Sequence, residues 1–183
     1  MQSINVTIEG VPPGLLQHRF PEITAAELAS NVKLAGKGKL SDEEYAELAA
    51  YRLKTGDLCQ PSEHVFQSLL KAAANFQIQG RGKKTYKDAV KGGVLIAPEY
   101  LSHGVRDYDI LSVPVRIQQA RVIRHRPLLK VWKLDFELTI LDPSVLPPDV
   151  LHAIANHAGA QIGIGDFRPR FGRFMVTKWD ARG

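Results

Sequence analysis

The chain has 183 residues, 44% of them hydrophobic and 23% charged, which is the size and composition of one globular domain with its own core. Its formal net charge of +5 favours an anionic partner. A single cysteine, Cys59, excludes an internal disulfide, and we find neither a signal peptide nor an apolar run of about 18 residues, so we expect a cytoplasmic protein without a membrane segment.

The first predicted element is a strand near the N-terminus. Apolar residues alternate with polar ones from Ile4 to Ile8, which is typical of a half-buried strand, and Gly10 ends it. His18 and Arg19 follow as an exposed pair, and we include both among the candidate nucleic-acid contacts. His18 has three interpretations: a stacking group, a general base or ordinary polar surface.

Two helices are predicted in the first half of the chain, after the weakly patterned residues 21 to 40. Ser41 and Glu44 have the spacing of a capping box, so a helix should begin there and continue until Gly56. A second helix should begin at Pro61, because apolar residues recur at helical spacing from Val65 onward. Its core-facing stripe comprises Val65, Phe66, Leu69, Leu70, Ala73 and Phe76.

A loop rich in glycine and basic residues follows the second helix, at residues 79 to 85. Arg81, Lys83 and Lys84 could contact a phosphate backbone, or the loop could be a solvated turn. It lacks the spacing of a P-loop. A short buried strand should follow at residues 93 to 96, and then a loop at residues 97 to 112.

Two further strands are predicted at residues 113 to 123 and 131 to 141. The second alternates cleanly, with Trp132, Leu134, Phe136, Leu138 and Ile140 on its buried face. We expect the two strands to form a hairpin whose tip is basic. No acid occurs between Val113 and Lys133, so Arg121, Arg124 and Arg126 are candidate phosphate contacts, the alternative being a solvated strand face.

The C-terminal part should contain a helix from Pro148, ended by Gly159, and a last strand from Phe174 to Trp179. Between them lies a segment, residues 163 to 174, that combines three glycines, three arginines and three phenylalanines. Its arginines are the leading candidates for nucleic-acid contact: Arg168, Arg170 and Arg173. The alternative is a structural loop in which an arginine pairs with Asp166 and the phenylalanines fill the core.

Two core helices with four or five strands predict an α+β fold of the ferredoxin-like kind. We expect a single domain spanning residues 1 to 183, with an insertion at about residues 21 to 57. Histidines are scattered; His152 and His157 are five residues apart, which is not the helical spacing of a metal pair. No motif for catalysis, a cofactor or a metal is found, so we expect a protein that is not an enzyme.

Three stretches carry a resemblance to a known family. They are Gly10–Leu16 after the first strand, Gln60–Lys71 at the start of the second helix, and the glycine-rich Gly163–Phe174. They resemble the RAMP superfamily, the RNA-binding ferredoxin-like proteins of CRISPR effector complexes, and the full pattern is similar to uncharacterised phage and prophage proteins. No family landmark matches residues 21 to 57, and no catalytic residue can be carried over.

The resemblance implies a protein that binds single-stranded RNA or DNA, with RNA favoured, as repeated subunits along the strand. The alternative is a phage or host-defence protein that docks onto, or mimics a subunit of, a CRISPR-type ribonucleoprotein complex. Its basic surface would then meet an acidic protein surface or RNA held by that complex. A likeness of fold does not separate these two functions, because function depends on the site.

Overall fold

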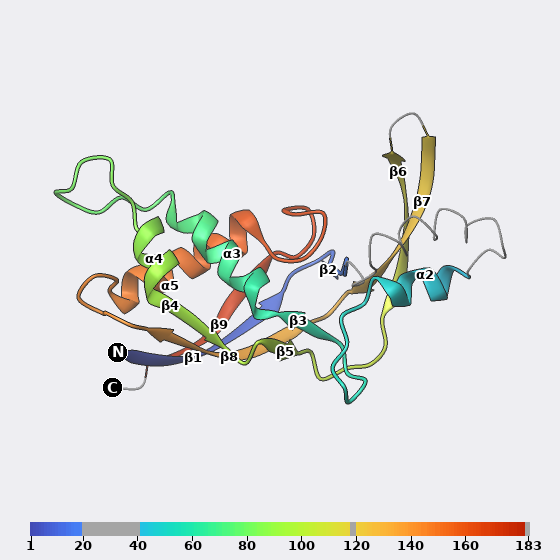
Figure 1. The fold of residues 1–183 in the computed structure, drawn as a ribbon, viewed down its shortest axis with the longest axis horizontal. Helices are drawn as coiled ribbons and strands as arrows, with labels where there is room; N and C mark the ends of the chain where they lie inside the picture. The colour runs from blue at the N-terminus through green and yellow to red at the C-terminus, as the bar shows by residue number, and fades with distance from the viewer. Residues whose placement is uncertain (20–40, 118–119, 182–183) are drawn as a thin grey trace, which may run out of the picture.

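The structure is a computed structural model that describes residues 1–19, 41–117 and 120–181 (Figure 1). Within those residues the protein is α+β, with four helices and antiparallel sheets. Residues 20–40, which include more than half of the expected insertion, lie outside the described part.

A four-stranded antiparallel sheet forms the centre of the molecule, in the order β4-β8-β1-β9. The first strand, β1 (Gln2–Gly10), lies between β8 (Lys133–Ile140) and β9 (Phe174–Ala181), and β4 (Val94–Ala97) is the edge strand beside β8. The alternation predicted for β1 and β8 is confirmed: the apolar residues of both strands are buried and pair across the sheet, as Val6 does with Phe136.

Three helices cover one face of this sheet (Figure 1). They are α3 (Ser62–Ala73), α4 (Lys87–Gly93) and α5 (Pro148–His157), and only α4 was not expected. The stripe predicted for α3 is confirmed, because Val65, Leu69 and Ala73 are buried and the other three residues pack against the core. Burying these stripes against the apolar sheet face is what holds the helices in place.

A long two-stranded arm extends away from the central sheet (Figure 1). It consists of β6 (Asp109–Ile117) and β7 (Ala120–Leu129), with the short β2 (Leu15–Leu16) paired to the base of β7. The single strand expected at residues 113–123 is therefore wrong, because the chain reverses within it. Since no glycine or proline lies near residues 118–119, ordinary turn signals did not reveal the reversal.

The expected hairpin with a basic tip at residues 124–130 is also wrong. Residues 124–129 form the second half of β7, and the strand that follows, β8, belongs to the central sheet rather than to the arm. The loop expected at residues 97–112 contains β5 (Tyr100–Ser102), which pairs with β3 (Cys59–Pro61). These elements connect the central sheet to the base of the arm.

The helix α2 (Asp42–Leu48) begins with the predicted capping box between Ser41 and Glu44 but ends well before Gly56. The apolar residues at helical spacing here, Tyr45, Leu48 and Ala49, predict a buried stripe, but only Ala49 is buried, whereas Tyr45 and Leu48 are exposed. The physical reason is that α2 packs on β7 of the arm rather than on the main core, and Tyr45 stacks on His125 of that strand.

The α5 helix does not end at Gly159, as its sequence suggests. It continues into a π-helical turn, Ala158–Ile162, and the backbone leaves the helix at Gly163, where φ is +73°. Gly159 has a packing role instead: a Cβ at this position would lie 2.2 Å from the carbonyl oxygen of Phe174. The close approach of the turn to β9 brings the following loop, residues 163–173, to the base of the arm.

Candidate nucleic-acid interface

The glycine–arginine loop, residues 163–173, is fixed at several points by backbone hydrogen bonds. The Ile164 amide donates to the Gly172 carbonyl over 2.9 Å, and the Gly172 amide donates to Gly14 over 2.8 Å. The Asp166 amide donates to the carbonyl of Leu16, also over 2.9 Å. The loop is therefore held against the segment that follows β1.

The three phenylalanines of this segment have different environments. Phe171 and Phe174 are buried, whereas 56% of Phe167 is exposed. Phe167 also has a left-handed backbone with φ of +56°, which costs about 1–2 kcal/mol for a residue with a side chain. Its amide donates to Asp166 Oδ1 over 2.9 Å, and its ring lies 6.0 Å from that of Phe171. These contacts hold an aromatic ring at the surface.

Asp166 joins the loop to the arm. Its Oδ2 lies 3.2 Å from Arg126 Nε of β7 and 3.7 Å from His18 Nδ1. An arginine does pair with Asp166, as one sequence interpretation proposed, but it comes from the arm rather than from the loop. Arg168, Arg170 and Arg173 form no ion pair within the described residues, and all three are exposed. The ion pair thus leaves the loop's own arginines available to a ligand.

The surroundings of His18 favour its neutral form. Burial, followed by the positive charge of Arg126, lowers its pKa below the ordinary value of 6.5, and Asp166 only partly opposes this. The shift reduces the positive charge that His18 would bring to an interface at neutral pH. His18 therefore lies among the basic residues, where it would contact a ligand through hydrogen bonds rather than through charge.

The remaining cations lie beside these contacts along the chain: Arg19 follows His18, Arg124 shares a face of β7 with Arg126, and Arg168 is two residues after Asp166. Tyr51 contacts His64 edge to face, with ring centroids 5.6 Å apart. Arg19 and Asp166 both act on the pKa of Tyr51, which burial raises. Arg168 helps burial to lower the pKa of His64, and Arg124 acts in the same way on His18. We name this group the junction cluster: His18, Arg19, Arg124, Arg126, Asp166 and Arg168.

The other predicted contacts lie elsewhere. Arg170 and Arg173 belong to the glycine–arginine loop, and Arg173 is bonded through its carbonyl to the Val11 amide. The exposed Arg81, Lys83 and Lys84 lie in the loop between α3 and α4, at the end of the molecule opposite the arm (Figure 1). Arg121 lies in β7, but its side chain is outside the described part of the structure.

The basic block between Val113 and Lys133 is less one-sided in space than in sequence. Arg126 meets Asp166, His125 Nε2 lies 3.4 Å from Asp42 of α2, and Lys130 Nζ lies 3.2 Å from Asp109 of β6. These acids are distant in sequence, so the local absence of acids did not predict the pairing. Three basic residues of the block, His125, Arg126 and Lys130, are thus answered by acids from other parts of the chain.

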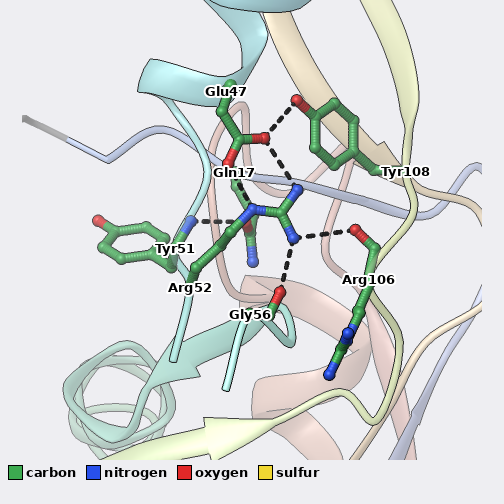
Figure 2. Close-up of polar contacts among 7 residues, drawn as sticks. All are labelled: Gln17, Glu47, Tyr51, Arg52, Gly56, Arg106 and Tyr108. Carbon is green, nitrogen blue, oxygen red and sulfur yellow. Dashed lines mark hydrogen bonds and ion pairs between the residues drawn. The ribbon is translucent and has the colours of Figure 1, made fainter. Parts of the chain in front are cut away.

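A polar network braces the base of the arm (Figure 2). Arg52 pairs with Glu47 of α2 and also donates to the carbonyl oxygens of Gly56 and Arg106, over 2.8 and 3.0 Å. Glu47 accepts a 2.9 Å hydrogen bond from Tyr108, which directly precedes β6. Burial and this hydrogen bond raise the pKa of Tyr108 to about 12, so it remains a donor at all ordinary pH values.

The face of the central sheet that the helices leave open carries no comparable basic group. Its described charged residues are Glu9, Lys133, Asp135, Glu137, Lys178 and Asp180, four acids against two bases. Thr7 donates to Asp135 over 2.6 Å, and Thr177 donates to Glu9 over 3.3 Å. This face is polar and mildly acidic, so it disfavours a polyanion.

An open pocket of about 420 Å³ adjoins the glycine–arginine loop. Its lining comes from α3, the π-helical turn and the loop: Lys71, Gln161, Ile162, Gly165, Asp166, Phe167, Arg168 and Pro169. Sequence reasoning missed Lys71 and Gln161 because neither belongs to a basic motif. It also missed Tyr51 and His64, which reach the junction from separate segments.

Comparison with models of protein families gives no match, and no curated protein matches this chain. Within residues 1–19, 41–117 and 120–181, no helix has the length and apolar character needed to cross a membrane. In the same part of the chain no three histidine, cysteine or acidic side chains gather as metal ligands would. The geometry of the junction is therefore the basis for a functional conclusion.

Proposed function

We propose that this protein binds single-stranded nucleic acid, RNA in preference to DNA, without catalysing a reaction on it. The proposal has one principal support: the gathering of Arg19, Arg124 and Arg168 around the junction. Arg170 follows Arg168 on the same loop. Lys and Arg side chains that gather from separate segments suit an extended phosphate backbone.

The arrangement of elements supports a RAMP-like relationship. The main sheet has the order β4-β8-β1-β9, and α3 and α5 lie between its strands in the chain. We propose that this is a ferredoxin-like topology, with the arm and α2 as additions to it. Under this proposal subunits would bind side by side along one strand, as the sequence resemblance implies.

Charge reversal of the loop tests the proposal. We expect fluorescence anisotropy to show that labelled single-stranded RNA binds the wild type, and that adding salt weakens this binding steeply. Arg168→Glu, Arg170→Glu and Arg173→Glu together should weaken binding by at least about 100-fold, because each contributes phosphate contacts and each glutamate repels them. Circular dichroism checks that the variant is folded.

The loop between α3 and α4 offers a matched control. Reversing Arg81, Lys83 and Lys84 changes the net charge by the same amount, at the other end of the helical layer. The proposal expects the junction variant to lose much more affinity than this control. Equal losses would indicate a general charge effect, and a wild type that binds neither RNA nor DNA would overturn the proposal.

A second candidate function is docking onto a protein or ribonucleoprotein complex, and the arm favours it. Two-stranded ribbons are marginally stable by themselves, and Ile123 of β7 is 60% exposed. An apolar side chain on a protruding ribbon suits a protein partner. Purified protein that carries no nucleic acid, judged from its ultraviolet absorbance, and that captures a ribonucleoprotein complex through the arm would favour this function over the first.

A further inference from the structure

We infer that the pocket beside the glycine–arginine loop holds one unpaired nucleobase of the bound strand, stacked on Phe167. This inference rests on the proposed function and deepens it, because it assigns a base-binding position as well as a backbone path. It draws on three observations: the conformation of Phe167, the composition of the pocket, and the anchoring of the loop.

Packing of the core does not account for the conformation of Phe167. A phenylalanine that served the core would be buried, as Phe171 is, yet Phe167 keeps 56% of its surface exposed in a left-handed conformation. Backbone strain at an exposed aromatic residue that lines a pocket points to a role toward a ligand. Every base has a flat face, so a presented ring provides a stacking platform for any of them.

The pocket also has the chemistry that a nucleotide requires. At about 420 Å³ it falls in the range of small-ligand pockets, which is about 300–1,000 Å³. Lys71 and Arg168 supply positive charge at its wall, suited to the phosphates on either side of the base. The amide of Gln161 can donate to or accept from a base edge, which gives no strong choice among bases.

The loop is held in place without a ligand. Asp166 fixes the Phe167 amide through Oδ1 and meets Arg126 of the arm through Oδ2. Because both oxygens of Asp166 are used within the protein, the phosphates of a ligand would meet Lys71 and Arg168 rather than a free carboxylate. A site that is already ordered loses little conformational entropy when its ligand binds.

Phe167→Ala tests the inference by comparing two oligonucleotides of equal length, one an oligoadenylate and one abasic. We expect the variant to bind the oligoadenylate roughly 5- to 100-fold more weakly than wild type, the range for one stacked base. Both proteins should bind the abasic strand equally. Met175→Ala is the matched control, because Met175 is also 56% exposed but lies on the acidic sheet face, and its loss should change affinity less than about twofold.

Phe167→Trp provides an independent signal. Its added fluorescence should be quenched by the oligoadenylate and left unchanged by the abasic strand, with wild type reporting the background from Trp132 and Trp179. Lys71→Gln should lower the affinity for both oligonucleotides and make the salt dependence of binding shallower by about one counterion.

Three results would overturn the inference. If Phe167→Ala binds the oligoadenylate as tightly as wild type and the salt dependence stays steep, the pocket does not bind a base. The proposed function is then unaffected. If Phe167→Ala binds the oligoadenylate and the abasic strand more weakly by the same factor, Phe167 holds the loop in place and does not contact a base. Failure of the wild type to bind either strand removes the proposed function and the base pocket together.

Discussion

The side chain of Gln17 connects its own segment to two others near the junction. It is fully buried; its Nε2 donates to the Cys59 carbonyl over 2.8 Å and to Gln60 Oε1 over 3.2 Å. Its Oε1 accepts from the Tyr51 amide over 2.9 Å, a contact that Figure 2 shows. One side-chain amide thus satisfies polar groups of two other segments, which explains how a polar residue is stable in the interior.

We expect Gln17→Met to lower the free energy of unfolding by about 2–4 kcal/mol, because it leaves buried polar groups without partners at nearly constant volume. Urea unfolding measures the change. The same substitution at Gln67, half-buried on α3 with an exposed side-chain hydrogen bond to Glu63, should cost less than about 0.5 kcal/mol. A Gln17→Met variant with the wild-type urea midpoint would show that the amide contributes nothing to stability.

His103 gives the molecule a pH dependence. It is buried against Trp132, with ring centroids 6.1 Å apart, and burial lowers its pKa to about 4 from 6.5. The unfolded chain therefore binds a proton below about pH 6.5 that the folded chain does not bind until about pH 4. The contribution of His103 to the free energy of unfolding is therefore fully present above about pH 6.5. It decreases by about 3 kcal/mol as the pH falls towards 4.

Urea unfolding of wild type and His103→Leu at a series of pH values between about 7 and 4.5 checks this. The variant removes the titrating ring, so its stability should fall less over that interval. Parallel curves for the two proteins would assign the acid sensitivity to other groups.

At the scale of elements, two glycine-to-alanine substitutions distinguish the effect of close packing on stability from the effect of helix propensity. Gly159→Ala would place a methyl group 2.2 Å from the Phe174 carbonyl oxygen, which must separate the π-helical turn from β9. Gly92→Ala, in α4, meets nothing within 4 Å. We expect Gly159→Ala to destabilise by at least about 2 kcal/mol and Gly92→Ala to stabilise by about 0.4–1 kcal/mol, both measured by thermal unfolding.

Elements defined by local periodicity could be predicted from the sequence, and elements defined by distant contacts could not. The strands β1 and β8 and the helices α3 and α5 have apolar patterns that match their burial. Tyr45 gave a misleading signal, because an apolar stripe does not say which surface it will meet. The reversal between β6 and β7 lacks the residues that mark a turn, so the arm had no local signature.

The candidate site shows the same division. The three arginines of the glycine–arginine loop could be selected by sequence, since they stand beside glycines and aromatic residues. The pairing of Arg126 with Asp166 joins positions 40 residues apart, and Lys71 reaches the pocket from the middle of the chain. Such contacts depend on the tertiary fold and have no pattern along the chain.

At the scale of the whole molecule, charge is divided between two sides. Among the described residues, the junction and its loop carry several arginines that form no ion pair, whereas the open sheet face has four acids and two bases. A polyanion that approaches from solution would be attracted to the first and repelled from the second. The net charge of +5 therefore understates the local field at the junction.

The position of β1 also has a consequence for biosynthesis. This strand is made before both of its neighbours in the sheet, β8 and β9, which follow it by more than 100 residues. A nascent chain thus carries an apolar strand whose sheet partners have not yet been made. Contacts so distant in sequence form slowly. Until they form, this strand is open to other pairings, including those that lead to aggregation.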